Sequence, residues 1–336
     1  MTRSREWRLI ARPQGEPTPR DFELAGVTLD EPGPGQILVA NDWLSVDPYM
    51  RGRMNAGRSY MPPFELGRAM SGGAVGTVTA SRAASIPVGA SVIHFAGWRE
   101  YAVLDAGDAQ PVDVRRSPAQ AYLGVLGATG LTAYVGLTDI AGVRTGDTVF
   151  VSGAAGAVGT VAGQIARNLG AARVIGSAGG PDKCARLLDD FGFDAAIDYR
   201  RGDLAAQLAA AAPDGIDVYF DNVGGEHLQA ALTVLNDFGR VALCGAVSVY
   251  NDTDSAPGPN NLHLATRKRI TLRGFLVGDH TARAGEWVRT AAGWLADGTL
   301  RAEETVVEGI DHAVDVFLAM MRGANTGKML VRLPRA

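Results

Sequence analysis

Three glycines at three-residue spacing are the first residues of this chain whose type and position could do chemistry. Gly153, Gly156 and Gly159 belong to the stretch 148–159, which reads T-V-F-V-S-G-A-A-G-A-V-G. Glycine lets the chain turn sharply and lets a phosphate approach the backbone where a Cβ atom would clash. The spacing therefore suits the binding of a pyrophosphate by backbone N–H groups, although such a triplet also occurs at tight turns of other α/β domains.

The elements around the glycines favour a dinucleotide site. Residues 148–152 form a short β-branched and aromatic run, which is typical of a buried parallel strand. After the glycines, apolar side chains recur at helical spacing as far as Leu169, and Gly170 gives a C-terminal stop signal. A strand, a glycine turn and a helix in this order place the positive end of the helix against a pyrophosphate.

A missing acidic residue is the second chemical signal. Sites for NAD place an Asp or Glu at the end of the second strand, about 20 residues after the glycines. No acidic residue occurs from Thr148 to Pro181, and Lys183 lies in the first turn of a predicted helix. A cation there opposes the helix dipole unless an anion is present, and a 2′-phosphate would supply it. The alternative is a solvated surface lysine, but the missing acid favours NADPH.

Metal ligands are scarce. Zinc needs three or four Cys, His or carboxylate ligands that converge, often with a C-x-x-C pair. The chain has two cysteines, Cys184 and Cys244, and neither Cys nor His occurs before His94. We expect no metal site and ordinary packing or surface roles for the histidines. Two cysteines form no disulfide framework, so we also expect a reducing, cytoplasmic location.

Composition excludes several classes of partner. The 336 residues suffice for two domains, and 46% hydrophobic with 20% charged residues is ordinary for a soluble protein. A net charge of −4 argues against a nucleic-acid or anionic-membrane partner. Polar residues interrupt the uncharged stretch 117–138, so we expect no membrane span.

The pattern of predicted elements changes near Tyr122. Before it, strand-like runs bounded by Gly and Pro predict a mostly β domain. These runs are 37–39, 74–79, 91–95 and 100–104. After it, strands alternate with helices, which predicts an α/β doubly wound parallel sheet. The strands are 148–152, 173–177, 195–199, 218–222, 240–246 and 270–277, and the helices are 182–191, 203–212, 226–236 and 282–295.

The end of the chain suggests a discontinuous domain. A helix at 310–321 precedes a lone terminal strand at 329–333. Because this strand follows a completed α/β unit, we expect it to return to the first sheet. We predict a β domain of residues 1–121 and 299–336, and a dinucleotide-binding domain of residues 122–298.

Six short motifs, in order, resemble the medium-chain dehydrogenase/reductase superfamily over nearly the whole chain. They resemble more narrowly its zinc-independent branch, which includes prostaglandin reductases, plant alkenal double-bond reductases and bacterial curcumin reductases. The motifs are Val46–Arg51, Thr129–Tyr134, Ala154–Gly159, Asp221–Gly225, Cys244–Asn251 and Asn325–Lys328. The resemblance implies a Rossmann domain and a GroES-like domain. Gly67–Ser71 lacks the Gly-His-Glu zinc motif of zinc-dependent relatives.

The resemblance also implies a set of NADPH-binding residues. Lys183 and Tyr199 would contact the 2′-phosphate with help from Ser177, although Tyr199 could instead cover the core. Asn222 would contact the cofactor, or cap the helix at Glu226. The full set is Thr129, Gly153, Ala155, Gly156, Ala157, Val158, Gly159, Ser177, Lys183, Tyr199, Asn222, Cys244, Tyr250, Phe275, Leu276, Val277 and Asn325. The backbone of 275–277 would hold the carboxamide, and Asn325 would bind cofactor or form a turn.

The activity that the resemblance implies is reduction of a C=C bond conjugated to a carbonyl, in an enone or enal. Tyr250 would be the catalytic donor to the enolate oxygen, unless it packs over nearby prolines. Tyr49, the second candidate catalytic residue, would line the substrate pocket with Met50 and Arg51. The alternatives are an NADPH quinone reductase and an inactive structural relative. Relatives also suggest a homodimer that joins strands 270–277 edge to edge.

Overall fold

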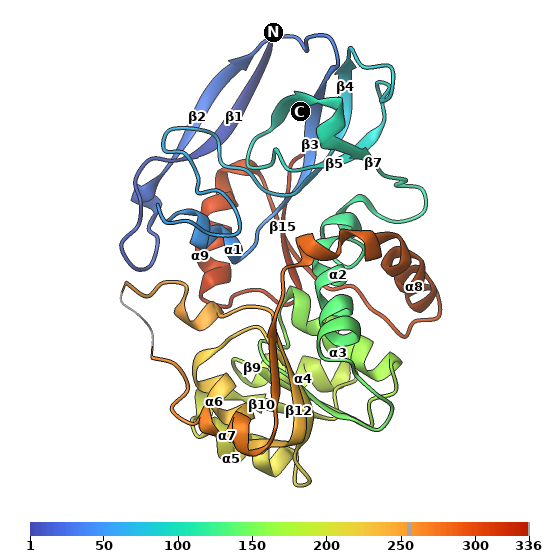
Figure 1. Cartoon of the computed structure of the whole chain (residues 1–336). Coiled ribbons are helices and arrows are strands. Elements are labelled where there is room, and N and C mark those ends of the chain that lie inside the picture. Colours follow the sequence, from blue (N-terminus) through green and yellow to red (C-terminus); the bar gives the residue numbers. More distant parts are fainter. Residues whose placement is uncertain (254–256, 335–336) are drawn as a thin grey trace. The chain divides into compact units, whose positions relative to one another are not determined.

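The computed structural model describes residues 1–253 and 257–334 (Figure 1). The chain forms two compact units. Unit 1 consists of Met1–Leu123, Glu304–Ala324 and Met329–Ala336, and unit 2 consists of Gly124–Glu303 and Asn325–Lys328. Over the described residues, no helix combines the length and the apolar character that crossing a membrane requires.

Unit 2 is built on a six-stranded parallel sheet. Its strands are β8 (Thr148–Val151), β9 (Arg173–Ala178), β10 (Ala195–Asp198), β11 (Ile216–Asp221), β12 (Leu235–Leu243) and β13 (Thr271–Gly274). They lie in the order β10-β9-β8-β11-β12-β13, and every neighbouring pair is parallel. The order reverses between β8 and β11, and ligands of such sheets bind outside the carboxyl ends of the strands at this point. The predicted doubly wound sheet is confirmed.

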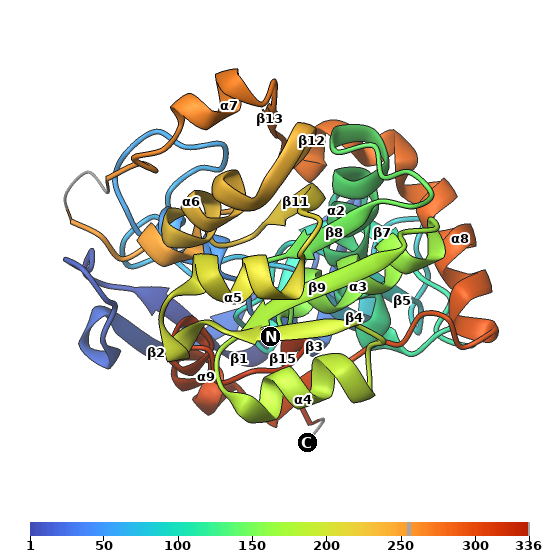
Figure 2. The same ribbon diagram turned by 90° about the horizontal axis from the view of Figure 1, so that it is seen from below.

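Helices lie on both sides of this sheet (Figure 2). In unit 2 they are α2 (Ala128–Val135), α3 (Ala157–Asn168), α4 (Pro181–Asp189), α5 (Leu204–Ala211), α6 (Gly225–Val234), α7 (His263–Arg267) and α8 (Ala284–Ala296). On one face, Phe150 and Tyr219 stack at 5.0 Å within the cluster that holds Leu208 of α5 and Leu232 of α6. Alternate strand residues face opposite sides, so both faces carry apolar side chains that the helices cover.

Unit 1 is mostly β, as predicted. Its strands are β1 (Thr2–Leu9), β2 (Phe22–Leu29), β3 (Gln36–Ser45), β4 (Ala74–Ser81), β5 (Ser91–His94), β6 (Tyr101–Asp105), β7 (Ala109–Pro111), β14 (Glu304–Glu308) and β15 (Lys328–Arg332). The long strand β3 pairs with β4 along one edge, and its other edge is shared by β6 and β15. The C-terminal strand β15 therefore completes a sheet that the N-terminal half begins.

Two short helices complete unit 1. They are α1 (Tyr49–Arg53) and α9 (Ala313–Met321). Phe317 of α9 is fully buried, and its ring meets that of Trp98 edge to face at 6.3 Å. Met50 of α1 belongs to the same core. The segment after β3 is thus anchored in the interior of unit 1 and is not an open loop.

Candidate functional site

The glycine loop after β8 has the geometry of a phosphate cradle. Gly153 has a left-handed φ of +57°, and Gly156 caps α3. A Cβ atom at Gly159 would lie 2.4 Å from the carbonyl oxygen of Gly153, so α3 packs directly on the loop. Gly156, Ala157 and the loop glycine before them are partly exposed, and the first turn of a helix leaves its N–H groups without helical partners. These residues fit a pyrophosphate.

A buried polar network fixes the loops at the reversal point of the sheet. The Asp221 Oδ1 atom accepts hydrogen bonds from the Tyr219 hydroxyl (2.6 Å) and from the backbone N–H groups of Val223 (2.9 Å) and Gly224 (2.8 Å). It also accepts from Ser152 Oγ at 3.2 Å, across the gap between β11 and β8. Burial raises the pKa of Asp221, and these hydrogen bonds oppose that rise. The network thus holds the loops after β8 and β11 together.

Asn222 is oriented by the same network. Its backbone N–H donates to Ser152 Oγ (3.0 Å), and its side-chain Nδ2 donates to the Ser152 carbonyl oxygen (2.8 Å). The residue that caps α6 is Gly224, so the alternative role of Asn222 as the N-cap is wrong. Sequence reasoning missed Ser152 and Asp221. The signal was present, because each is a polar residue at the end of an apolar strand.

The loop after β12 carries Tyr250. The backbone N–H groups of Cys244 (2.9 Å) and Gly245 (3.0 Å) donate to the Asp221 carbonyl oxygen, which ties this loop to β11. The Tyr250 hydroxyl oxygen accepts from the Ala246 N–H at 3.4 Å, so its own proton is directed elsewhere. Burial raises the pKa of Tyr250, so the phenol keeps its proton at neutral pH. Burial also raises the pKa of Cys244 to about 12, so Cys244 is a neutral thiol.

A group of basic and hydroxyl side chains surrounds the Gly179–Gly180 turn after β9. A Cβ atom at Gly179 would lie 2.7 Å from the Tyr199 hydroxyl oxygen and 2.9 Å from Arg200 Nε. Lys183 Nζ donates to the Asn325 carbonyl oxygen at 2.6 Å. Burial, and then the charge of Arg200, lower the pKa of Lys183. Lys183 and Tyr199 were predicted; Arg200 was missed, although it follows Tyr199 directly.

Ser177 is buried, and Asn325 forms the turn that the sequence offered as the alternative to cofactor binding. Ser177 is fully buried, and within the described residues its hydroxyl has no hydrogen-bond partner, so the structure does not support its contact with a phosphate. The Asn325 side chain donates to the Gly327 carbonyl oxygen at 2.7 Å, as in a turn. The Gly327 N–H donates to the Ala155 carbonyl oxygen at 2.8 Å, so this turn lies beside the glycine loop.

The remaining predicted cofactor residues lie at three places in unit 2. Thr129 is half-buried in the first turn of α2. Phe275, Leu276 and Val277 follow β13 directly, and the Phe275 ring meets Phe220 of β11 edge to face at 6.4 Å. Val158 and Gly159 lie in the first turn of α3. The glycine-loop, Asn222 and Phe275 positions all follow the carboxyl ends of strands of one parallel sheet.

Two of the three substrate-pocket residues predicted in unit 1 are buried. Met50 is fully buried in the core, and a Cβ atom at Gly72 would lie 2.5 Å from its Cε. Arg51 is 2% exposed, and its guanidinium donates to the Gly15 carbonyl oxygen (2.8 Å) and to Asn55 Oδ1 (2.7 Å). Both side chains are thus held inside unit 1, and their place in the substrate pocket beside Tyr49 stays a prediction. Tyr49 is half-buried, and burial raises the pKa of its hydroxyl.

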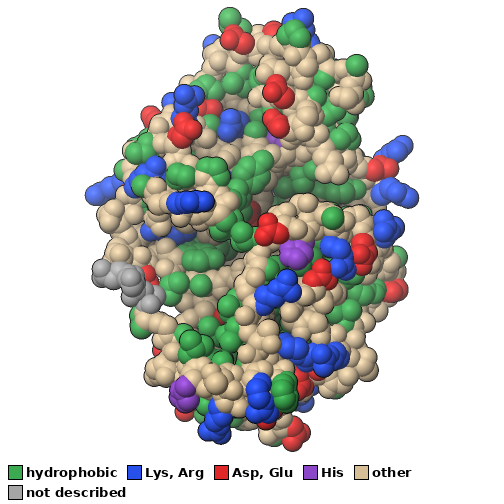
Figure 3. All heavy atoms as spheres, in the orientation of Figure 1, with side chains coloured by type: hydrophobic (Ala, Val, Ile, Leu, Met, Phe, Trp, Pro, Cys, Tyr) green, Lys and Arg blue, Asp and Glu red, His purple; other side chains and the backbone are tan. Residues whose placement is uncertain are grey.

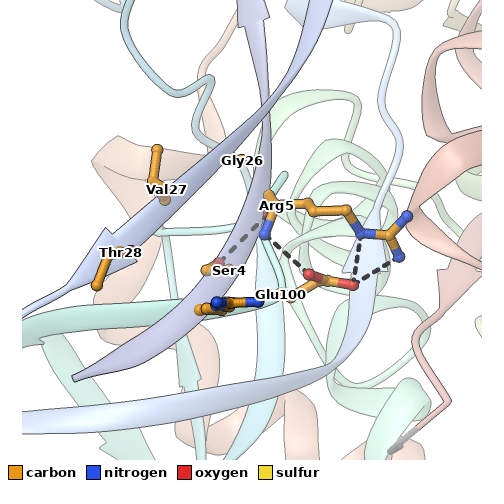
Figure 4. A pocket seen from close by; sticks show the side chains of 7 residues that line it. Ser4, Arg5, Gly26, Val27, Thr28 and Glu100 are labelled. Carbon is orange, nitrogen blue, oxygen red and sulfur yellow. Dashed lines mark hydrogen bonds and ion pairs between the residues drawn. The ribbon is translucent and has the colours of Figure 1, made fainter.

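Other surface features of the chain do not suggest a site. An open hollow of about 460 Å³ lies on unit 1 beside β1 and β2, but its Arg5 is paired with Glu100 at 2.7 Å (Figure 4). Basic and acidic side chains are interspersed on the face shown in Figure 3. Within residues 1–253 and 257–334, His, Cys, Asp and Glu form no cluster that could hold a metal ion.

Comparison with known proteins gives matches along nearly the whole chain. Residues 5–112 match a family described as the N-terminal domain of oxidoreductase, and residues 157–295 match one described as zinc-binding dehydrogenase. The NADPH-dependent curcumin reductase of Escherichia coli is 40% identical, over 98% of this chain and 97% of that protein. Prostaglandin reductase 1 of Bos taurus is 38% identical, over 99% of this chain and 100% of that protein.

A solved structure shows the same fold. The crystal structure of CurA from Vibrio vulnificus in complex with NADPH superposes with a TM-score of 0.94 at 40% identity, and the match covers 99% of this chain and 100% of that one.

Proposed function

Because the chain belongs to the zinc-independent branch of the medium-chain dehydrogenase/reductase superfamily, we propose that it reduces the C=C bond of α,β-unsaturated ketones or aldehydes with NADPH. The observation that carries the proposal is the end of β9, where a Gly-Gly turn with no acidic residue is flanked by Lys183 and Tyr199. A 2′-phosphate fits this arrangement, whereas an NAD site places an acidic residue at the end of this strand itself. The nearby Asp198 carboxylate belongs to β10, and its Oδ1 atom accepts the N–H groups of Gly180 and Arg200.

Different residues of unit 2 are proposed to bind different parts of the cofactor. We assign the pyrophosphate to the backbone of residues 153–159 and the 2′-phosphate to Lys183 and Tyr199. Asn222, Thr129, Cys244, residues 275–277 and Asn325 are assigned to the rest of the molecule. When bound, NADPH supplies a hydride for the β-carbon of the substrate. The part of the protein is to orient the substrate and stabilise the charge that develops on its oxygen.

Tyr250 is the proposed donor to that oxygen. Hydride addition at the β-carbon turns the enone or enal into an enolate, whose oxygen one hydrogen-bond donor can stabilise. A proton delivered to the α-carbon then gives the saturated carbonyl compound. The Tyr250 hydroxyl is protonated and accepts the Ala246 N–H, so its proton is available to a ligand. The amide contact also lowers the phenol pKa, which favours donation. Tyr49 is the proposed contact of unit 1 with the substrate.

The decisive assay is the consumption of NADPH with a panel of enones, enals and quinones. The proposal expects turnover of enones or enals with formation of the saturated carbonyl product. Turnover of quinones alone would favour a quinone reductase, and no turnover of any compound would favour an inactive relative.

Substitution of Lys183 tests the cofactor assignment. Lys183→Ala should raise the KM for NADPH about ten- to a hundredfold, because a charge-assisted contact with phosphate contributes about 1.5–3 kcal/mol. The KM for NADH should hardly change. Equal use of NADPH and NADH by the unaltered protein would refute the assignment.

Substitution of Tyr250 tests the mechanism. Tyr250→Phe removes a donor that matters most as charge builds, so kcat should fall more than cofactor affinity. The expected loss is on the order of 10²–10³ where this donor acts alone. Tyr49→Phe should change mainly the KM for the substrate. If Tyr250→Phe turned over a small enone as fast as the unaltered protein, under conditions where chemistry limits the rate, another group would be the hydrogen-bond donor to the enolate oxygen.

We also propose a homodimer through β13. This strand ends the parallel sheet, and its residues Thr271, Arg273 and Gly274 are exposed. An unpaired strand edge invites pairing, and a second copy would satisfy it by a symmetric contact. Light scattering should give twice the chain mass of 35.2 kDa, and a monomer at micromolar concentration would contradict the proposal.

A further inference from the structure

We propose that Arg200 is a specificity-determining residue, whose guanidinium forms the second cationic arm of the site for the cofactor's 2′-phosphate. This inference rests on the proposed binding of NADPH and extends it to a residue that neither the motifs nor the comparisons identify. It concerns which dinucleotide the protein selects and makes no claim about the reduction step.

The position of Arg200 is set by the parallel sheet. Strands β9 and β10 are neighbours, so the turn after β9 and the turn after β10 lie side by side. The Asp198 Oδ1 atom joins them, since it accepts from the N–H groups of Gly180 (2.9 Å) and Arg200 (3.1 Å). The guanidinium then passes over the first turn, because a Cβ atom at Gly179 would lie 2.9 Å from Arg200 Nε. Any larger residue at Gly179 would displace the guanidinium.

The guanidinium of Arg200 is not bound by a carboxylate among the described residues, although Asp198 accepts a hydrogen bond from the Arg200 backbone N–H at 3.1 Å. Over the described residues, Arg200 forms no ion pair, whereas nearby Arg186 binds Asp190 (2.8 Å) and Glu303 (2.9 Å). Arg200 is instead close enough to Lys183 to lower the pKa of that ammonium. Two cations held near each other repel unless an anion lies between them. A phosphate monoester carries nearly two negative charges at neutral pH and would remove this repulsion.

The chemistry of the guanidinium suits this anion. Arginine presents planar N–H donors that can bind two phosphate oxygens together, while a lysine acts as a point charge. Lys183 of α4 and the Tyr199 hydroxyl and Arg200 of the turn after β10 then approach one group from two elements. The ribose of NADH offers only a hydroxyl there, so the contribution of Arg200 separates the two cofactors and adds little to their shared affinity.

Binding of nucleotide fragments tests the inference without any turnover. Titration calorimetry would compare 2′,5′-ADP, which carries the 2′-phosphate, with 5′-AMP, which lacks it. Arg200→Met should lower the affinity for 2′,5′-ADP about 5- to 30-fold, because one charge-assisted contact at an exposed site is lost. Its affinity for 5′-AMP should stay within about twofold of that of the unaltered protein. Arg200→Lys should lose less affinity than Arg200→Met, since lysine keeps the charge but lacks the paired N–H donors of the guanidinium.

Arg201→Met is the matched control. Arg201 is the next residue of the same short helical turn and is also exposed, but the atoms nearest to a Cβ at Gly179 or Gly180 belong to Tyr199 and Arg200. It should leave both affinities within about twofold. Gly179→Ala is a second variant, which keeps every charge but moves the Arg200 guanidinium. It should also lower the affinity for 2′,5′-ADP.

Two results would overturn the inference. One is Arg200→Met protein, with an unchanged melting temperature, that binds 2′,5′-ADP as the unaltered protein does. The other is an equal loss in Arg201→Met, which would show an effect of net charge alone. Failure of the proposed function is seen separately, because the unaltered protein would then bind 5′-AMP as tightly as 2′,5′-ADP.

Discussion

Gly159→Ala tests whether the contact of α3 with the glycine loop matters for folding and for cofactor binding. The new Cβ atom would lie 2.4 Å from the Gly153 carbonyl oxygen and 2.6 Å from Ala154 Cα, where 3.4 Å is ordinary contact. Both neighbours are backbone atoms, and Gly153 is fixed in a left-handed conformation. The clash can therefore be relieved only if the start of α3 moves away from the loop by about 1 Å, the shortfall from ordinary contact.

The size of the effect follows from two opposing terms. Overpacking of this kind costs about 1–3 kcal/mol, and the better helix propensity of Ala offsets up to about 1 kcal/mol. A net loss of about 1–2 kcal/mol lowers the melting temperature by roughly 2–8 °C in a unit of this size. A displacement of about 1 Å also breaks one or two N–H contacts to the pyrophosphate, so NADPH should bind about ten- to a hundredfold more weakly.

Calorimetry for NADPH and a thermal melt would measure both quantities. Gly293→Ala is the matched control, because it makes the same change within helix α8 of the same unit and a Cβ atom there meets nothing within 4 Å. It should leave NADPH binding unchanged and the melting temperature equal or slightly higher. A Gly159→Ala protein that behaves like this control in both measurements would refute the reasoning.

Three further outcomes are expected. Burial lowers the pKa of His227 to about 4, so its contribution to the free energy of unfolding is present above about pH 6.5 and falls by about 1.4 kcal/mol per pH unit toward pH 4. His227→Gln should make the denaturation midpoint depend less on pH. Parallel plots of the midpoint against pH for the variant and the unaltered protein would contradict this. Prolonged treatment with a chelator should leave the activity intact, because Gly67–Ser71 holds no zinc ligand. One bound zinc per chain in elemental analysis would contradict the expectation that the chain has no zinc site. Lys268 Nζ donates to three carbonyl oxygens at and just beyond the end of α6. Lys268→Met should therefore lower the free energy of unfolding by about 1–2 kcal/mol. An unchanged melting temperature would exclude a stabilising role of Lys268 at this helix end.

Local patterns in the sequence were enough for the parallel sheet and its glycine loop. The apolar run before Gly153 and the helical spacing after Gly159 depend on neighbours within a few residues, and they fix the strand and the helix wherever the sheet lies. The acid-free stretch before Lys183 is equally local. Strands β1 and β2 were missed because β1 carries four charged side chains and β2 has Ala25 and Gly26 at its centre, so neither shows a clear apolar pattern.

Tertiary structure alone decided which distant residues meet. Ser152 and Asp221 belong to different motifs, yet the strand order places β8 beside β11 and joins them in one network. Arg200 reaches Gly179 only because β9 and β10 are parallel neighbours. Burial, too, is a property of the packed unit: Met50 stands in a motif whose family resemblance suggested a pocket, but the core of unit 1 surrounds it. Sequence patterns describe the faces of an element, while the neighbours of each face are fixed only when the elements pack.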